Sequence, residues 1–296
     1  MNDALDPEAL GEMPEDLLVI QDLIVEYPNR ASRRHPFRAL HEVNLRIAAG
    51  ETLGLVGESG SGKSTIGRAV LGLAPIARGD IRFDGRSITR LRPRARRELS
   101  RDIQVVFQDP YTSLNPAMTV NDILTEPLLV TGTSKADAQR RVRELLDEVQ
   151  LPSNAGSRYP REFSGGQRQR VAIARALCRE PRLIVADEPV SALDLSTQAR
   201  VLDLFADIQA RTGVALLFVT HDLDVVRHIS DRVAVMRAGR ILETGDTESV
   251  ITDPQHPYTR ALLLASPIAH PTQQAERRAE RLDFLTSQTA SITAVR

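Results

Sequence analysis

The pattern of apolar and polar residues predicts short strands and helices that follow one another along the chain. Residues 17–27 have the apolar content of a strand, and residues 43–47 alternate apolar with polar positions as a half-buried strand does. A short apolar run at residues 52–56 precedes a glycine-rich stretch, and helical patterning follows at residues 66–73. We therefore expect a strand, a loop and a helix here, after a loose acidic tail over residues 1–16.

The middle of the chain is expected to be largely helical. A strand is predicted at residues 103–107, and helices and loops replace strands from residue 109 to about residue 180. Ser134 followed by Asp137 is a capping pattern for the start of a helix. One apolar stripe follows at helical spacing, formed by Val142, Leu145, Leu146 and Val149. We interpret residues 109–180 as an inserted α-helical subdomain.

The last third of the chain returns to alternating strands and helices. Residues 183–186 and 214–220 are apolar runs typical of strands buried on both faces of a parallel sheet. An amphipathic helix is predicted between them near residues 201–208, and residues 232–243 are expected to form a hairpin. Alternation of strands and helices around a glycine-rich loop predicts an α/β fold.

Composition narrows the class of protein. The chain has 296 residues, of which 42% are hydrophobic and 26% charged, as in ordinary globular proteins. The net charge of −1 gives no general attraction to nucleic acid or anionic lipid. The longest apolar run, residues 214–219, is too short to cross a bilayer, and the acidic start lacks the regions of a signal peptide. A cytosolic location is expected.

Two local features of the composition favour structural interpretations. Residues 86–101 contain seven arginines, but no aromatic residue lies among them to stack on bases. A solvated helical face therefore fits better than a nucleic-acid patch, which remains the alternative. Cys178 is the single cysteine, which excludes an internal disulfide and a multi-cysteine metal cluster. Its apolar neighbours predict a buried structural thiol.

The glycine-rich stretch matches the pattern G-x-x-x-x-G-K-[ST] in the required setting, between a strand and a helix. Its glycines let backbone N–H groups approach phosphate oxygens, and the helix start adds unpaired N–H donors. Lys63 is expected to reach the β- and γ-phosphates of a nucleoside triphosphate, and the Ser64 hydroxyl to ligate Mg²⁺. The alternative, a glycine-rich turn beside a lysine, ignores the flanking strand and helix. The stretch comprises Gly57, Glu58, Ser59, Gly60, Ser61, Gly62, Lys63, Ser64 and Thr65.

Two carboxylates follow the buried strand at residues 183–186. Ligands in open α/β sheets bind at the carboxyl ends of the strands, which is where Asp187 and Glu188 are expected. Asp187 can hold Mg²⁺ directly or through its water shell. Glu188 can orient and deprotonate the water that attacks the γ-phosphate. An acidic turn at the end of a strand is the plainer interpretation, which the glycine-rich loop disfavours.

A second pair of glycines precedes a predicted helix at Ser164, Gly165, Gly166 and Gln167. Ser164 is placed to cap that helix, whose N-terminus is a second place suited to an anion. With this Ser-Gly-Gly-Gln sequence after the glycine-rich loop, the chain resembles the ATP-binding subunits of ABC transporters, whose signature motif has these residues. The resemblance covers about residues 17–268.

The resemblance implies a P-loop NTPase core of the RecA-like type over residues 17–250. This core has an antiparallel β subdomain in addition to the inserted helical subdomain. Tyr27 matches the aromatic residue that stacks on adenine in this family, and Gln108 matches the Q-loop glutamine that touches Mg²⁺ and the attacking water. Asp194 belongs to the D-loop at the dimer interface, and His221 matches the switch histidine that contacts the γ-phosphate. Alone, each would be an ordinary core or surface residue.

The same resemblance implies partners and cofactors. Two cassettes of this family face each other head to tail, with ATP between the phosphate loop of one and the signature motif of the other. We therefore expect a second ATPase subunit, either this chain or a homologous one, and two transmembrane permease subunits. An extracytoplasmic solute-binding protein would act indirectly, and no nucleic acid is expected. ATP and Mg²⁺ are the implied cofactors, at the cytoplasmic face of the membrane, where the subunit would be peripheral.

Three stretches resemble the ATPases of oligopeptide and dipeptide importers, a group that includes nickel, opine and glutathione importers. They are residues 107–116, 159–163 and 256–263. Import of peptides or a related small solute is therefore expected, with residues 251–296 as the C-terminal extension of this type. Some members hold an iron–sulfur cluster through cysteines in this tail, and because the tail here has none, we predict no cluster.

Two other functions were weighed against transport. A soluble ABC ATPase acting on ribosomes or nucleic acid usually has two cassettes in one chain or long coiled coils, and this chain has neither. A phosphate-loop kinase outside the ABC group leaves the signature sequence and His221 unexplained. The expected ATPase would use Lys63, Gln108, Glu188 and His221 in catalysis, and Ser64, Gln108 and Asp187 at the metal.

Overall fold

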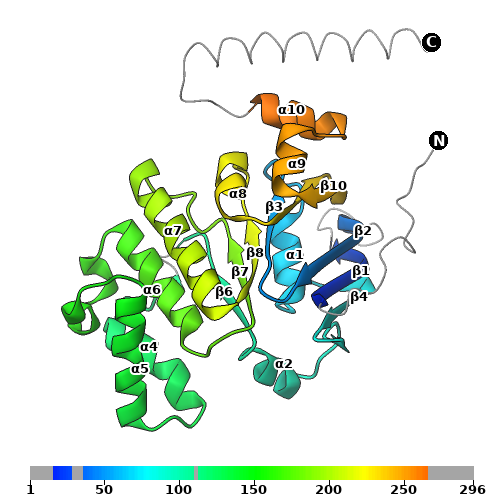
Figure 1. Cartoon of the computed structure of the whole chain (residues 1–296). Coiled ribbons are helices and arrows are strands. Elements are labelled where there is room, and N and C mark those ends of the chain that lie inside the picture. The colour runs from blue at the N-terminus through cyan, green and yellow to red at the C-terminus, as the bar shows by residue number, and fades with distance from the viewer. Residues whose placement is uncertain (1–15, 29–35, 110–112, 266–296) are drawn as a thin grey trace, which may run out of the picture.

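The computed structural model describes residues 16–28, 36–109 and 113–265, which form two sheets flanked by helices (Figure 1). The strand order is β2-β1-β4-β5 in one sheet and β10-β9-β3-β8-β7-β6 in the other. Apart from Asp16, the predicted acidic tail lies outside the described residues, as does most of the C-terminal extension beyond residue 265.

The smaller sheet is antiparallel. It consists of β1 (Asp16–Tyr27), β2 (Phe37–Ala48), β4 (Ile76–Phe83) and β5 (Arg86–Ser87). The predicted alternation in β2 is confirmed, because Val43, Leu45 and Ile47 are buried while Asn44 is exposed. β2 is longer than the predicted 43–47 because its pairing with β1 continues through several register shifts to Phe37.

The larger sheet has a parallel centre. Parallel pairs join β3 (Thr52–Val56) to β8 (Ala215–Val219) and β9 (Arg232–Arg237), and β7 (Leu183–Asp187) to β8 and β6 (Ile103–Val106). β10 (Arg240–Asp246) closes one edge as an antiparallel hairpin with β9. The hairpin turns at Ala238 and Gly239, which both have positive φ, as a tight two-residue turn requires.

Both faces of the central strands are buried, which explains their continuous apolar sequence. Ile184 and Ala186 pack into a core with α6 (Gly165–Leu177) and α7 (Leu195–Thr212). The alternate residues Leu183 and Val185 pack instead with α1 (Lys63–Val70) and the antiparallel sheet. Figure 1 shows α6 and α7 on one side of these strands and α1 on the other.

The stretch between β6 and β7 is helical, with α4 (Val120–Val130), α5 (Lys135–Glu148) and two short 3₁₀ turns (Ser153–Ser157 and Pro160–Glu162) before α6. The predicted cap is present, because the Ser134 side chain accepts a hydrogen bond from Asp137 N at 3.1 Å. The predicted stripe is also confirmed, with all four of its residues buried in the core that α6 and α7 share.

A third apolar cluster covers the β9–β10 side of the larger sheet. It joins Val56 at the end of β3 to residues of β9, α8 (Leu223–Ile229), α9 (Thr247–Thr252) and α10 (Pro257–Ala265). Tyr258, Leu262 and Leu263 of α10 pack in this cluster.

The arginine-rich segment only partly matches the predicted solvated face. Its helix, α2, is limited to Pro93–Leu99. Arg96 is not solvated like its neighbours, because its guanidinium donates to Val70 O at 3.2 Å and to Ile88 O at 2.5 Å, and burial lowers the pKa of Arg96. The side chain therefore connects α2 to the end of α1 and to the residue after β5.

Candidate nucleotide site

The carboxyl ends of the parallel strands collect most of the predicted site. The phosphate loop follows β3, Asp187 ends β7, His221 lies two residues beyond β8, and Gln108 lies two residues beyond β6. Because these four strands are parallel neighbours, their carboxyl ends lie at one edge of the sheet. The fold therefore brings together motifs that are up to 164 residues apart along the chain, the separation of Gly57 and His221.

The shape of the phosphate loop requires glycine at two positions. A Cβ on Gly57 would lie 2.1 Å from Met236 O, so no other residue fits at this contact with β9. Gly62 has φ of 108°, in the region that favours glycine, and a Cβ there would lie 2.8 Å from Met236 Cε. β9 thus supports the loop from behind, which leaves its other side for a ligand.

Several polar groups of the loop are suited to an anion. The N-terminus of α1 has no side-chain cap, so its first N–H groups can turn toward phosphate oxygens. Lys63 is 4% exposed, and its Nζ donates to Gly57 O at 2.7 Å and to Glu58 O at 3.0 Å. Burial lowers the pKa of Lys63, and the charges of Glu188 and Asp187 oppose that shift. Ser61 Oγ is buried without a hydrogen-bond partner.

The pair formed by Ser64 and Asp187 fits a magnesium ion. Ser64 Oγ donates to Asp187 Oδ1 at 2.8 Å, which places a hydroxyl and a carboxylate oxygen together at the start of α1. Burial raises the pKa of Asp187, against the effect of the Ser64 hydrogen bond. Oxygen donors of this kind are what Mg²⁺ prefers. No group of three or more His, Cys, Asp or Glu side chains could hold a metal in the described ranges.

Glu188 and His221 lie side by side beyond the strand ends. Their Oε2 and Nδ1 atoms are 3.3 Å apart, with Glu188 17% exposed and His221 52% exposed at the side chain. Glu188 has φ of 48°, uncommon for a residue with a side chain, and its backbone N–H and C=O are both hydrogen-bonded. Glu188 N donates to Val219 O at 2.9 Å, and Glu188 O accepts from Ser191 Oγ at 3.1 Å and from Ser191 N at 3.3 Å. These bonds fix the backbone of Glu188 at the end of β7.

Gln108 and Tyr27 have positions compatible with their expected roles. Gln108 is exposed beyond β6, at the same edge of the sheet as Asp187. Tyr27 ends β1, is half-buried and pairs with Phe37 of β2. Their roles remain predictions.

The Ser-Gly-Gly-Gln sequence forms the predicted helix start. Ser164 Oγ accepts from Gln167 N at 3.3 Å, and Gln167 Oε1 accepts from Ser164 N at 3.1 Å, a reciprocal capping box. Next to it, Asp194 caps α7 by accepting from Thr197 N at 3.0 Å. Hydrogen bonds from Ser196 and Thr197 lower the pKa of Asp194 to about 2.

A single chain does not bring the signature residues to its own phosphate loop. Ser164 begins α6, which packs on one face of the parallel strands, whereas Lys63 begins α1 on the opposite face (Figure 1). The loop and the signature sequence therefore belong to two separate surfaces of the molecule.

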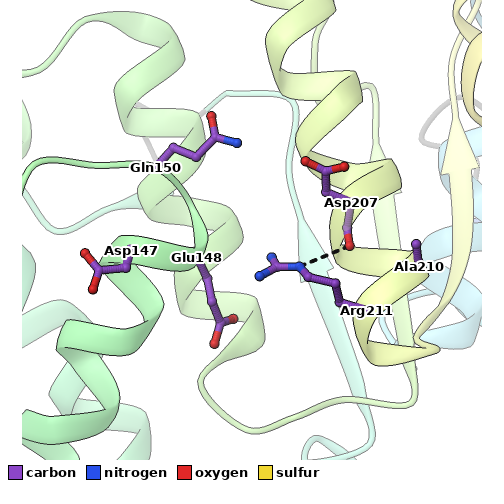
Figure 2. Close-up of a pocket in the computed structure, with 6 residues that line it drawn as sticks. All are labelled: Asp147, Glu148, Gln150, Asp207, Ala210 and Arg211. Atoms are coloured by element: carbon purple, nitrogen blue, oxygen red, sulfur yellow. Dashed lines mark hydrogen bonds between the residues drawn. The ribbon is translucent and has the colours of Figure 1, made fainter.

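A pocket among the described residues lies away from this site. It has a volume of about 400 Å³ and is lined by the end of α5 and the C-terminal part of α7 (Figure 2). Asp147, Glu148 and Asp207 give it a mainly acidic lining, with Arg211 donating to Asp207 O. α7 ends just before β8 begins, so this pocket lies near the amino ends of the strands, away from Lys63. An acidic lining is unsuited to a nucleoside triphosphate.

One residue near the site was not predicted as part of it. Tyr258 has its hydroxyl 3.4 Å from Glu58 N in the phosphate loop. The two residues are 200 positions apart, and no local pattern relates them. The only sequence signal was the similarity of the stretch around Tyr258 to one group of transporters.

In the part of the chain that the structure describes, no helix combines the length and apolar character that crossing a membrane requires.

Comparison with known proteins agrees with this geometry. Residues 40–191 match the family model described as ABC transporter, and residues 242–288 match the model described as oligopeptide/dipeptide transporter, C-terminal region. The chain is 49% identical over 269 residues to a putative peptide import ATP-binding protein of Brucella ovis, covering 90% of this chain and 84% of that one. It is 47% identical to the oligopeptide transport ATP-binding protein OppF of Lactococcus lactis, covering 90% and 85%.

A solved structure is similar as well. It is the dimeric ATP-binding cassette MJ0796 in a post-hydrolysis state bound to ADP and Pi, with a TM-score of 0.69 and 29% identity. The match covers 78% of this chain and 98% of that one. The fold is therefore that of an ABC ATPase cassette, a P-loop NTPase of the mixed α/β type, as the sequence predicted.

Proposed function

This chain belongs to the ABC transporter family of ATP-binding proteins, and we propose on that premise that it is the ATPase subunit that energises import of peptides or a related small solute. The observation that supports this most is the meeting of Lys63, Ser64, Asp187, Glu188 and His221 at one edge of the parallel sheet. The match of residues 242–288 to the peptide-transporter C-terminal region supports the choice of solute.

The chain's own residues supply the parts that hydrolysis of ATP needs. The N–H groups of the phosphate loop and the Lys63 ammonium hold the phosphates, and Lys63 exchanges its contacts with Gly57 O and Glu58 O for phosphate oxygens. Glu188 accepts a proton from the attacking water, because its carboxylate is held at the strand end near the loop. His221, 3.3 Å from Glu188, lies on the side where the γ-phosphate would be.

Ser64 and Asp187 would hold Mg²⁺, with Gln108 as a further oxygen ligand from the neighbouring strand. The ion supplies positive charge that neutralises the phosphate oxygens during transfer. Tyr27 would stack on the adenine from the antiparallel sheet. These assignments rest on the match of each residue to its motif and on its place at the sheet edge.

A second cassette is proposed because the phosphate loop and the signature sequence lie on separate surfaces of one chain. Because Ser164 and its neighbours lie on a different surface from Lys63, they would contact the ATP bound to a second subunit. Nucleotide would then form part of the interface, so that binding closes the dimer and hydrolysis releases it. The dimeric state of the similar cassette supports this arrangement. The second subunit would be a homologous chain or this chain itself, since this one contains both halves of a site.

The solute itself would pass through other chains. Two transmembrane permease subunits would form the channel, and an extracytoplasmic solute-binding protein would deliver the peptide to them. The ATPase would therefore sit at the cytoplasmic face of the membrane as a peripheral subunit. The relatives include proteins named for the import of peptides and of glutathione. These names support this class of solute.

Co-purification from the native cell tests the proposal. The tagged full-length chain would be solubilised with mild detergent and its partners identified by mass spectrometry, with an untagged strain as the control. Two polytopic membrane proteins recovered together with an ATPase subunit are the expected result. Recovery with ribosomes or nucleic-acid-bound proteins, without any membrane subunit, would overturn the transport function and leave the ATPase intact.

A further inference from the structure

The segment after β10 packs against the strand that leads into the phosphate loop. Tyr258 belongs to the apolar cluster that contains Val56, the last residue of β3, and Leu223, the first residue of α8. Val56 directly precedes the loop, and Leu223 follows His221 by two residues. The beginning of α10 therefore lies against both the phosphate-loop side and the His221 side of the site.

Hydrogen bonds fix the start of α10 in position. The carboxylate of Glu243 in β10 accepts from Gln255 N at 2.7 Å and from His256 N at 3.2 Å. His256 Nδ1 then accepts from Tyr258 N at 3.0 Å, so the imidazole caps the first turn. Pro257 occupies the first helical position, where its missing N–H costs nothing.

Tyr258 extends from this fixed start to the phosphate loop. The residue is 7% exposed, and the Arg237 guanidinium lies over its ring at 4.7 Å from the centroid. Its hydroxyl accepts a hydrogen bond from Glu58 N at 3.4 Å. Burial raises the pKa of Tyr258, so the hydroxyl keeps its proton at neutral pH.

The contact is made to a peptide group of the loop that Lys63 also contacts. Gly57 lies against Met236 O of β9, and its carbonyl, which shares a peptide group with Glu58 N, accepts from Lys63 Nζ at 2.7 Å. When Lys63 turns to phosphate oxygens, Gly57 O loses that donor. The Tyr258 hydroxyl on Glu58 N then remains as a side-chain contact that holds this peptide group.

We propose that Tyr258 is a positioning residue that holds the phosphate loop in its ATP-binding shape from the C-terminal segment. His256 and Glu243 fix Tyr258, and Tyr258 fixes Glu58. Because coupling between sites is reciprocal, nucleotide bound at the loop also stabilises the start of α10. The inference rests on nucleotide binding and is independent of the identity of the solute.

Removal of the hydroxyl alone tests the contact. For the purified full-length chain, Tyr258→Phe is expected to weaken binding of a fluorescent ATP analogue about 2-fold to 10-fold, the range for one hydrogen bond. KM for ATP rises correspondingly, while kcat and the melting temperature change little because the ring still packs. Val250→Ala is the matched control. Val250 is buried in the same apolar cluster, but it has no hydroxyl that could bind the loop. This control lowers the melting temperature and leaves ATP affinity unchanged.

The hydrogen-exchange rate of backbone amides provides a second measurement. It would not respond to the nucleotide if Tyr258 had only a structural role. Addition of the ATP analogue to the wild-type chain is expected to slow exchange of amides in Pro257–Ala265, and Tyr258→Phe is expected to lose this effect. Equal ATP affinity of Tyr258→Phe and wild type, with unchanged exchange in α10, would overturn the inference and leave the ATPase function standing. A wild-type chain that binds no ATP would overturn both.

Discussion

Two charged residues have different surroundings in the candidate nucleotide site. Lys63 is buried at the start of α1 against the carbonyls of its own loop, and Glu188 follows the end of β7 beside His221. In the proposed function, Lys63 binds phosphate and Glu188 acts on the attacking water. Substitution of each should therefore affect a different step.

Glu188→Gln is expected to lower kcat for ATP hydrolysis by about 100-fold or more, because the amide cannot accept the proton of the attacking water. ATP affinity should stay close to that of the wild type. In contrast, Lys63→Ala should weaken ATP binding by about 10-fold or more, since it removes a charged donor to phosphate. Steady-state hydrolysis and equilibrium binding, measured on the same preparations, separate the two effects. Hydrolysis retained by Glu188→Gln would rule out this residue as the base.

Cys178 is the buried thiol that its sequence context predicted. It is 3% exposed, and its Sγ lies 3.3 Å from Leu124 O. Burial raises the pKa of Cys178 to about 12 from an ordinary value of 9.0. The folded protein thus keeps the proton where the unfolded chain loses it, so the stability linked to this group is full below pH 9 and falls as the pH rises toward 12.

Two measurements test the titration of Cys178. Iodoacetamide should not modify the native protein at pH 8 and should modify it after unfolding in urea, because only the thiolate reacts. Cys178→Ala should show a smaller loss of urea stability than the wild type between pH 8 and pH 10. Rapid alkylation of the native protein would contradict the buried thiol.

At the scale of elements, the starts of α6 and α7 fit against each other through a glycine. A Cβ on Gly166 would lie 2.2 Å from Thr197 Cγ2, so the capping box of α6 and the Asp194 cap of α7 depend on close approach of the two helices. This packing positions the signature residues on the face of the molecule that lies away from Lys63.

Gly166→Ala should therefore displace the start of α6 at a cost of about 1–3 kcal/mol in the free energy of unfolding, as overpacking does. ATP hydrolysis should fall while ATP binding to the chain's own loop is retained, because the loop lies on the other face of the sheet. Thr197→Ser in the same chain removes Cγ2 and keeps the hydroxyl bond to Asp194, so the double variant should recover activity. Gly156→Ala is the control, since its Cβ would have ordinary contacts from 3.6 Å. No rescue by Thr197→Ser would refute the steric explanation.

Periodicity and motifs predicted much of the fold and the residues that gather at the carboxyl ends of the parallel strands. The apolar runs at β7 and β8, the stripe of α5 and the caps at Ser134 and Ser164 are local features, and local sequence determines them. What depends on distant contacts was not predicted. Three features each depend on a segment that only the tertiary fold brings near. They are the hydrogen bond from Glu58 N to the Tyr258 hydroxyl, the hydrogen bond from Arg96 to Val70 O, and the positive φ of Glu188.

At the scale of the whole molecule, the phosphate loop and the signature sequence lie on different surfaces of one chain. The loop lies near Asp187, Glu188 and His221 at the carboxyl ends of the parallel strands, and the signature sequence begins a helix on another face. Transport would follow if ATP joins two such chains and its hydrolysis separates them, because permease subunits attached to the cassettes would move with each cycle. The chemistry of Glu188 would then be needed for every round of import.

Uptake of a labelled peptide mixture by the native cell tests this central claim most directly. Cells would express, as their only copy of this chain, either the wild type or Glu188→Gln at equal protein levels. The account predicts ATP-dependent uptake with the wild type and uptake reduced to background with Glu188→Gln. Uptake by the Glu188→Gln cells at the wild-type rate would contradict the account.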